Sequence, residues 1–235
     1  MSVEVTANEN WARGLAASWL PGEKFRWELY SECLAGALAP SLPWLDLGCG
    51  PSDFIAEHGN RASPAVGVDL QRHRPPPGLF VTARLEELPF PAGFAGTLSL
   101  RFVLEHIERP GRLWDECRRL LAPGGRIVII TTNRRSPFVA LARLLPGRLR
   151  ERIISRVFDV GREEIFPACH RWNTPGCLAA PPAGFELERI EFVEALDWTR
   201  RTLFLGQLLL AKITRPRSLR KFRSNVLAVY RRAED

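Results

Sequence analysis

Short runs of apolar residues alternate along this chain with segments in which apolar residues recur at helical spacing. Strands that are buried on both faces of a parallel sheet have such near-continuous apolar runs, and the helices between them connect one strand to the next. We interpret seven runs as strands: 44–47, 65–70, 79–81, 96–102, 126–131, 185–193 and 225–230. The pattern therefore predicts an α/β fold built on a mostly parallel sheet.

Helical patterns precede and separate these runs. Residues 53–59 and 110–121 carry apolar side chains at helical spacing, and the Pro-Gly-Gly run 123–125 ends the second pattern and permits a sharp turn into the next strand. The tryptophan-rich opening, 1–43, predicts two short helices broken at Pro21 and Gly22.

Two long insertions interrupt the alternation. Residues 133–183, expected to be largely helical, separate the fifth and sixth strands, and residues 197–224 separate the last two. Insertions of this length are usually functional. Within 133–183, Thr174 and Pro175 have the residue types of a helix N-cap and first helical position. No repeat or linker marks a domain boundary, so we expect 1–235 to form one domain.

The positive charge of the chain is local. The net charge is +7, from 33 Lys and Arg against 26 Asp and Glu, but eight of the basic residues lie within 199–223, where there is no acidic residue. The rest of the chain therefore carries 25 basic against 26 acidic side chains. One segment makes the protein basic, and the location of that segment matters more than the total.

Cysteine usage and hydropathy suggest a reduced, cytoplasmic protein. The five cysteines are odd in number and form no C-x-x-C pair, and no apolar leader opens the chain. The longest apolar stretch, 203–213, is far shorter than the roughly 20 residues of a membrane-spanning helix. No cluster of His, Cys, Asp and Glu has metal-ligand spacing, so we expect no metal.

A glycine turn carries the clearest chemical signal. The strand 44–47 leads directly into Gly48-Cys49-Gly50 and then into a helical pattern. Glycine lets backbone N–H groups and a helix N-terminus approach a ligand closely. Asp69 follows Gly50 by nineteen residues, at the offset where a carboxylate accepts hydrogen bonds from ribose hydroxyls. Together these features predict a nucleoside ligand.

Five sequence landmarks extend this motif. They are L-D-L-G-C-G-P at 45–51, V-G-V-D at 66–69, E-E-L-P-F-P at 86–91, V-L-E-H-I at 103–107 and R-R-L-L-A-P-G-G-R at 118–126. With these landmarks in this order, the stretch 44–132 resembles the class I S-adenosylmethionine-dependent methyltransferases. Within that family it resembles the subgroup similar to ubiquinone and menaquinone C-methyltransferases. The resemblance implies a Rossmann-like seven-stranded sheet in the order 3-2-1-4-5-7-6, with strand 7 antiparallel and helices on both faces.

The resemblance also implies S-adenosyl-L-methionine as the cofactor, bound across the ends of strands 1, 2 and 4. Asp46 and the backbone of the glycine turn would face its methionine part, Asp69 its ribose, and Leu85 with Glu86 its adenine. Arg101 would lie near the sulfonium. The full set of implied cofactor-binding residues is Asp46, Gly48, Cys49, Gly50, Asp69, Leu70, Leu85, Glu86, Arg101 and Phe102.

Three positions depart from the family pattern. Arg84 stands where the family commonly has an aspartate that binds the adenine amino group, Ala95 where it commonly has aspartate after phenylalanine, and Ser52 where a third glycine is frequent. The loss of one adenine contact should weaken binding by about 1 kcal/mol.

Methyl transfer from a sulfonium is an in-line displacement, so a general base is optional and alignment of the acceptor is the main requirement. We expect His170, beside Arg171 and Trp172, to be the best candidate base. His106 is a second candidate, with a structural hydrogen-bonding role as the alternative. His58 and His73 are expected to face solvent. The segment 166–172 is expected both to pack and to act as a lid.

The N-terminal helices and the two insertions are the parts in which this family varies its acceptor. We interpret three tryptophans either as a cover for the cofactor pocket or as ordinary hydrophobic-core residues: Trp11, Trp19 and Trp27. Arginines mix with bulky aliphatic residues in 133–156, and 199–223 adds an apolar helix among basic residues. These segments are interpreted either as a solvated face or as a surface for peripheral contact with a lipid or membrane.

The sequence thus predicts a methyltransferase that acts on an oxygen, nitrogen or carbon atom of a largely apolar small molecule, such as an aromatic metabolite or a quinone-like lipid. A non-catalytic cofactor-binding or interaction protein is the alternative, suggested by Arg84 and Ala95. A nucleic-acid acceptor is disfavoured because no N-P-P-Y type motif follows strand 4 and no RNA-binding domain is appended.

Overall fold

The computed structural model describes residues 3–51, 54–71, 79–147 and 168–234. Its helices and strands follow in the order α1 Val3–Trp19, α2 Arg26–Ala37, β1 Trp44–Leu47, α3 Phe54–His58, η1 Gly59–Arg61, β2 Ala65–Asp69, β3 Leu79–Thr82, β4 Ala95–Arg101, η2 Leu104–His106, α4 Pro110–Leu120, β5 Leu121–Thr132, α5 Pro137–Leu144, α7 Pro175–Ala179, β6 Phe185–Val193, α8 Arg201–Ile213, η4 Arg220–Phe222 and β7 Asn225–Arg232. Helices and strands alternate as the apolar pattern predicted.

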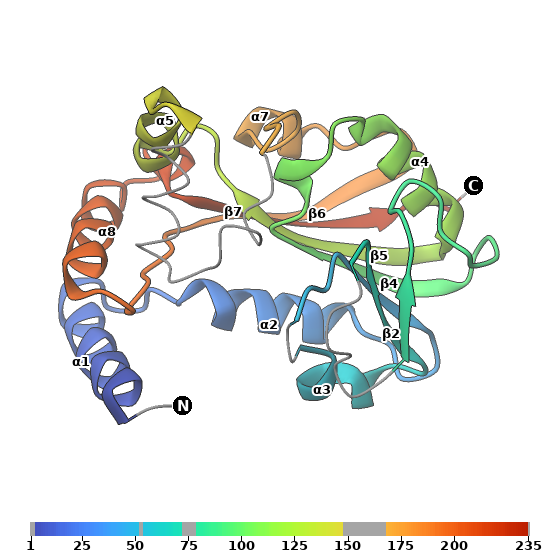
Figure 1. The fold of residues 1–235 in the computed structure, drawn as a ribbon, viewed down its shortest axis with the longest axis horizontal. Coiled ribbons are helices and arrows are strands. Elements are labelled where there is room, and N and C mark those ends of the chain that lie inside the picture. Colours follow the sequence, from blue (N-terminus) through green and yellow to red (C-terminus); the bar gives the residue numbers. More distant parts are fainter. Residues whose placement is uncertain (1–2, 52–53, 72–78, 148–167, 235) are drawn as a thin grey trace. The chain divides into compact units, whose positions relative to one another are not determined.

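Within the described residues, seven strands form one sheet in the order β3-β2-β1-β4-β5-β7-β6 (Figure 1). The pairs β1–β2, β1–β4, β2–β3 and β4–β5 are parallel, and β7 is antiparallel. This confirms the predicted strand order. The central strands β1 and β4 are buried almost throughout, as strands covered by helices must be, whereas the edge strand β3 is partly exposed.

The prediction for the start of the fifth strand was wrong by five residues. We expected a turn at 123–125 and a strand from Arg126, but β5 begins at Leu121. Leu121 pairs directly with Ala95, and the register shifts before Arg126 pairs with Thr97. The Pro-Gly-Gly run is therefore an irregularity inside the strand, where Gly124 takes a φ of +73°.

The chain divides into two compact units. One comprises 1–29, 132–167 and 192–226, and the other comprises 30–131, 168–191 and 227–235. We call them the helical unit and the sheet unit. The expectation that 1–235 forms one domain stays a prediction.

The helical unit has its own core between α1 and α8. Phe204 and Leu208 of α8 pack with Ala12 and Ala16 of α1, and Leu196 completes the cluster. The ring of Trp11 lies 5.4 Å from that of Phe204. Within this unit, therefore, α1 contributes its aromatic side chain to core packing.

In the sheet unit, α4 presents an apolar face with Trp114 at its centre. The Trp114 ring packs against Phe185 and Tyr230 at centroid distances of 5.5 and 5.4 Å, and against Trp172 at 6.2 Å. The Tyr230 hydroxyl donates to the Leu178 carbonyl at 2.6 Å. Of the segment 166–172 that we expected to pack, Trp172 does so, and residues 166 and 167 lie outside the described residues.

Helices in the two insertions agree with their sequence signals where they are described. The Thr174 hydroxyl accepts a hydrogen bond from the Cys177 amide at 3.2 Å, and Pro175 is the first residue of α7. This confirms the predicted N-cap. Residues 148–167 of the first insertion lie outside the described residues. No helix in the described part of the chain has the length and hydropathy needed to cross a membrane.

Neighbouring leucines on α8 provide a test of the helical unit. Leu208→Ala should lower the free energy of unfolding by about 2–5 kcal/mol, because Leu208 is fully buried against α1. Leu209→Ala should change it by less than about 0.5 kcal/mol, because that side chain is 53% exposed. Urea denaturation of both variants measures the difference, and equal losses would contradict this packing.

Candidate functional site

The candidate site lies in the sheet unit, where β1, β2 and β4 reach their carboxyl ends. Parallel strands end at the same edge of a sheet, which is where ligands bind in open α/β folds. The amides of Gly48 and Cys49 both donate to the Val68 carbonyl, at 2.7 and 3.1 Å. These bonds fix the turn after β1 against the end of β2.

The two glycines of this turn have different surroundings. Both take left-handed backbone conformations, with φ of +67° at Gly48 and +57° at Gly50. A Cβ added to Gly48 would overlap the Val103 side chain, whereas a Cβ added to Gly50 would meet no atom within 4 Å. Gly48 is therefore needed for packing, and Gly50 borders open space into which a ligand can approach the backbone.

Asp69 connects the glycine turn to the next loop. Its carboxylate accepts hydrogen bonds from the amides of Gly50, at 2.9 Å, and Gln71, at 3.0 Å. Its carbonyl accepts from the Ala83 amide at 3.0 Å. A carboxylate offers about four acceptor sites and can hold several donors at once. The half-buried Asp69 thus has the chemistry needed to receive ligand hydroxyl groups.

The buried ion pair of Asp46 and Arg101 lies next to the glycine turn. Asp46 is almost completely buried on β1, and its carboxylate accepts from Arg101 Nη2 at 2.6 Å and from the Ser99 hydroxyl at 2.6 Å. Trp44 Nε1 donates to the same hydroxyl at 2.7 Å. Burial tends to lower the pKa of Arg101, but the adjacent Asp46 carboxylate outweighs this and raises it.

Arg101 also reaches the turn itself. Its Nη2 donates to the Cys49 carbonyl at 3.2 Å, and its guanidinium lies 4.2 Å from the centre of the Phe54 ring. Tyr30 packs edge-on against that ring. Burial raises the pKa of the Cys49 thiol to about 12, so the thiol is neutral at physiological pH. Sequence analysis did not identify Tyr30 or Phe54 because neither lies in a motif.

The predicted adenine contacts lie in the next loop. Leu70 follows Asp69 and is largely exposed, and Leu85 and Glu86 are half-buried in a turn closed by the pairing of Arg84 with Glu87. The Ala83 bond described above ties this loop to the end of β2. The loop that carries Leu85 and Glu86 is thus joined to Asp69, whose side chain bonds the glycine turn.

Two side chains of α4 hold the loop in place. Glu116 accepts from the Leu88 amide at 2.7 Å, and Arg119 donates to the carbonyls of Phe90 and Leu88 at 2.7 and 3.1 Å. Arg119 and Glu116 are also paired with each other. These bonds tie the E-E-L-P-F-P segment to α4 and to the R-R-L-L segment at its end.

The departures from the family pattern have different positions. Arg84 is exposed in the turn beside Leu85. Ala95 is the first residue of β4 and Arg101 is the last, which places Ala95 about 20 Å from the carboxyl edge. The substitution at Ala95 therefore does not touch the site. Ser52 lies outside the described residues.

Of the two candidate catalytic histidines, His106 follows the end of β4 and His170 belongs to the insertion after β5. The Glu105 carbonyl accepts from the amides of Cys169, at 2.7 Å, and His170, at 2.9 Å, which brings the second segment to the turn containing His106. Thr131 donates to the buried Glu105 carboxylate at 2.7 Å. Both catalytic assignments stay predictions.

Two residues at this edge have left-handed backbone conformations that non-glycine residues rarely adopt. They are Phe102, with φ of +54°, and His170, with φ of +52°. Asn173 Nδ2 lies 2.8 Å from His170 Nδ1. Such strained residues often occur at functional sites.

One histidine expectation was wrong. His58 was expected to face solvent, but its side chain is only 13% exposed and packs against the Phe54 ring at 5.7 Å. Burial lowers its pKa, although the nearby Glu57 carboxylate opposes the shift. His106 is half-buried in η2, and His73 lies outside the described residues. No group of three or more potential metal ligands gathers in the part of the chain that the structure describes.

Comparison with known proteins fits this geometry. A profile described as "Methyltransferase domain" matches residues 45–129, which contain the glycine turn, Asp69 and Arg101. Residues 45–129 thus match a methyltransferase domain. The fold of the chain is also that of solved methyltransferases. One from Mesorhizobium loti is 21% identical, with a TM-score of 0.57, covering 88% of this chain and 97% of its own.

The methyltransferase domain has recognisable relatives among curated proteins. A ubiquinone biosynthesis O-methyltransferase of Psychrobacter cryohalolentis is 32% identical over 38% of this chain and 40% of its own length. An uncharacterized methyltransferase of Mycolicibacterium gilvum is 32% identical over 52% of this chain and 53% of its own. The chain spans about two fifths to one half of the length of such relatives.

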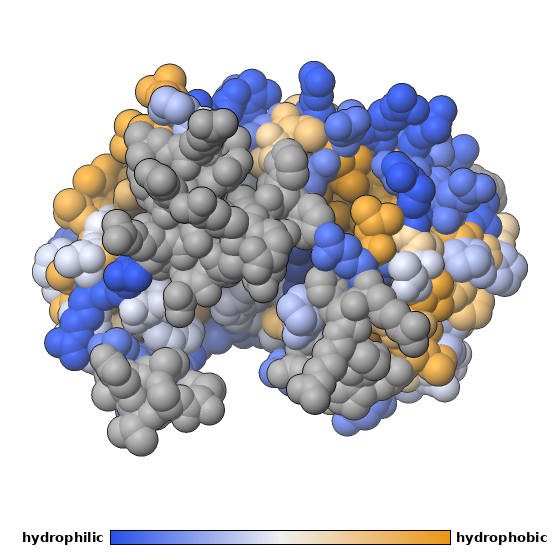
Figure 2. All heavy atoms as spheres, viewed as in Figure 1, coloured by the Kyte–Doolittle hydropathy of each residue, from blue (hydrophilic) through white to orange (hydrophobic). Residues whose placement is uncertain are grey.

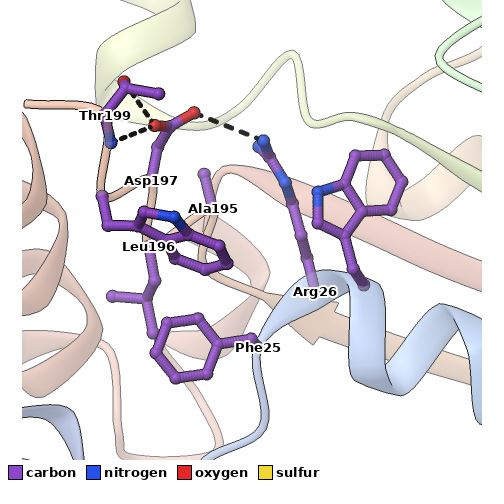
Figure 3. Close-up of a pocket in the computed structure, with 8 residues that line it drawn as sticks. Phe25, Arg26, Ala195, Leu196, Asp197 and Thr199 are labelled. Carbon is purple, nitrogen blue, oxygen red and sulfur yellow. Dashed lines mark hydrogen bonds and ion pairs between the residues drawn. The ribbon is translucent and has the colours of Figure 1, made fainter. Parts of the chain in front are cut away.

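The helical unit contains a separate pocket. It has a volume of about 180 Å³ and is lined by Phe25, Arg26, Trp27, Ala195, Leu196, Asp197, Trp198 and Thr199 (Figure 3). An apolar cavity of about 150 Å³ can hold a benzene molecule. The pocket therefore has room for about one aromatic ring. Trp27, which we had read as a possible cover or core residue, lines it.

Aromatic rings and one ion pair define this pocket. Phe25 and Trp198 pack edge to face at 5.5 Å, and the Arg26 guanidinium lies 5.1 Å from the Trp27 ring. Arg26 Nη2 lies 3.5 Å from the Asp197 carboxylate, which Thr199 holds through its amide and hydroxyl. Burial lowers the pKa of Arg26, although the nearby carboxylates oppose the shift.

The backbone of the pocket is also strained. Leu196 has a φ of +46° and is buried in the core shared by α1 and α8. Gln207 of α8 accepts from the Asp197 amide at 2.6 Å and so holds the segment that follows. Sequence analysis missed this pocket because its two halves are about 170 residues apart.

The two turn glycines should respond differently to substitution. Gly50→Ala should lower the free energy of unfolding by about 1–2 kcal/mol, the cost of a left-handed alanine. Gly48→Ala should lower it by about 1–3 kcal/mol more, because its methyl group also overlaps Val103. Chemical denaturation measures both. If Gly48→Ala proves no more damaging than Gly50→Ala, the packing of Val103 against this turn is wrong.

Proposed function

We propose that this protein transfers a methyl group from S-adenosylmethionine to a largely apolar small molecule. The observation that carries the proposal is the open glycine turn at Gly50, hydrogen-bonded to Asp69 at the carboxyl edge of the sheet. A left-handed glycine beside open space lets backbone amides approach a ligand, and the carboxylate can bind ribose hydroxyls. The methyltransferase relatives support the same cofactor.

The described residues fit the cofactor part by part. The amides of the glycine turn would hold the methionine end, Asp69 would bind the ribose, and Leu70 with Leu85 would pack against the adenine. Glu86 lies in the same turn as Leu85. S-adenosylmethionine, when bound, supplies an electrophilic methyl group on a sulfonium.

A cationic cofactor raises an electrostatic question at Arg101, because like charges at this edge would repel. The Asp46 carboxylate, 2.6 Å from Arg101, neutralises the guanidinium within the protein. The pair can therefore orient the turn through the Cys49 carbonyl without presenting a net positive charge to the sulfonium. In this proposal Asp46 acts as a positioning residue.

The acceptor proposal rests on the pocket of the helical unit. Its aromatic walls favour a planar ring, and Arg26, whose charge the Asp197 carboxylate balances only in part at 3.5 Å, favours an acceptor that carries a carboxylate, phenolate or carbonyl oxygen. A quinone-like or aromatic metabolite meets both conditions. The curated relative named ubiquinone biosynthesis O-methyltransferase supports this class. The methylated atom is an oxygen, nitrogen or carbon of such a molecule.

Turnover separates this proposal from a non-catalytic binding protein. The purified chain is incubated with S-adenosylmethionine and a panel of phenols, aryl carboxylates and quinols, and S-adenosylhomocysteine release is measured. Release above the acceptor-free control supports the enzyme. Binding without release across the panel supports the non-catalytic alternative, and methyl transfer into bulk RNA would support a nucleic-acid acceptor instead.

Asp69→Ala tests the cofactor assignment. We expect it to weaken S-adenosylhomocysteine binding by about 2–4 kcal/mol, because two charge-assisted hydrogen bonds are lost. Calorimetric titration measures the affinity, with Asp115→Ala, an exposed carboxylate on α4, as the matched control. Unchanged affinity in Asp69→Ala would show that the ribose assignment is wrong.

Arg26→Met tests the acceptor pocket. Methionine keeps an apolar stem but removes the cation, so affinity for an aromatic carboxylate should fall about tenfold or more while affinity for its uncharged amide should stay within about threefold. Calorimetry with both ligands measures this, and Arg112→Met on α4 is the exposed control. Equal weakening for both ligands would indicate that Arg26 only supports the fold.

A further inference from the structure

Two helices of the helical unit expose large parts of several leucine side chains. On α5 none of the described side chains is buried, and Leu141 and Leu144 are 62% and 81% exposed. Their spacing of three places them on one helix face, together with the exposed Phe138. The solvent-exposed face of a helix normally carries polar residues. This face of α5 carries apolar residues instead.

On α8 the apolar residues form two opposite faces. Phe204, Leu208 and Ala211 pack against α1. Leu205, Leu209 and Ile213 recur four residues apart on the other side and are 44%, 53% and 56% exposed. One apolar face of α8 thus stabilises the unit, and the second faces outward.

The outward faces of α5 and α8 adjoin. A Cβ added to Gly206 of α8 would lie 3.8 Å from the Phe138 ring, so the helices approach each other there. Figure 1 shows the two helices side by side, and Figure 2 shows hydrophobic colour along the edge where they lie. We call the exposed residues of both helices the apolar surface: Phe138, Leu141, Leu144, Leu205, Leu209 and Ile213.

The segments that carry this apolar surface also carry an excess of positive charge. Neither 133–147 nor 199–223 contains an acidic residue. The exposed basic residues of these two segments are Arg134, Arg135, Arg143, Arg200, Arg201, Lys212, Arg215, Arg217 and Lys221. Lys212, on the exposed side of α8, lies 4.5 Å from the Trp19 ring. Leucines flanked by cations and aromatic residues are typical of helices that lie in a membrane interface.

We propose that the apolar surface docks on an anionic lipid bilayer. Acyl chains would cover the leucines, and lipid phosphates would pair with the surrounding cations. A symmetric contact with a second copy would bring the same cations face to face, which is unfavourable. A nucleic acid would satisfy the cations but leave the leucines in water. This inference concerns a surface distinct from the methyltransferase domain and does not depend on methyl transfer.

Vesicle flotation of the full chain tests the proposal. The protein is mixed at low salt with vesicles of phosphatidylcholine alone or phosphatidylcholine with phosphatidylglycerol. It should float with the second and not with the first. Leu141→Ser combined with Leu144→Ser should reduce the bound fraction at least about tenfold, because two leucine side chains would leave the acyl region.

Matched control variants distinguish binding through the apolar surface from nonspecific adsorption to vesicles. Leu79→Ser removes a leucine that is 58% exposed on β3, and it should leave flotation unchanged. The double variant Arg215→Gln with Arg217→Gln should reduce the floating fraction and make flotation less sensitive to salt. The control Arg112→Gln on α4 should change neither the floating fraction nor its salt dependence.

Three results would overturn the proposal. The first is absence of flotation with anionic vesicles at low salt, and the second is equal loss in the Leu79→Ser control. The third is that the protein does not bind vesicles and instead either dimerises with increasing concentration or binds RNA, and that the leucine variants abolish this dimerisation or RNA binding. Circular dichroism of each variant confirms that lost flotation is not lost folding.

Discussion

The buried pair of Asp46 and Arg101 is the interaction on which the candidate site depends. It joins the adjacent strands β1 and β4 near their carboxyl ends, and the same guanidinium bonds the Cys49 carbonyl inside the glycine turn. Removing two charges from water costs several kcal/mol per ion. The hydrogen bond from Ser99 to Asp46 and the Phe54 ring beside Arg101 offset part of that cost. The position of the turn is therefore set by electrostatics and not by glycine geometry alone.

The sequence predicts those features whose physical causes are local. The glycine turn, Asp69 and the Thr174 cap each depend on residues a few positions apart or on a spacing fixed by one βα unit, and the structure has them as expected. Strand order required a resemblance to a known family, because periodicity does not specify which strands are neighbours. The start of β5 was misplaced because strand pairing with Ala95 overrode the local Pro-Gly-Gly signal.

Other features depend on contacts between distant residues, which no local pattern reveals. Asp46 and Arg101 are 55 positions apart, and Arg26 and Asp197 are 171 apart. The burial of His58 depends on its packing against Phe54, and the left-handed backbone of Leu196 on the core around it. In each case tertiary packing stabilises a polar group in a buried position, or a residue in a strained backbone conformation, that the residue would not adopt by itself.

The histidine at this edge bears on how methyl transfer would be catalysed. Asn173 Nδ2 donates to His170 Nδ1, so a neutral imidazole carries its proton on Nε2, which then donates and does not accept. His170 could act as a base through Nε2 only if Asn173 turned its oxygen toward Nδ1. In the observed arrangement, a neutral His170 is therefore a hydrogen-bond donor at Nε2 and not a base. The arrangement therefore favours catalysis by positioning, which an in-line displacement requires in any case.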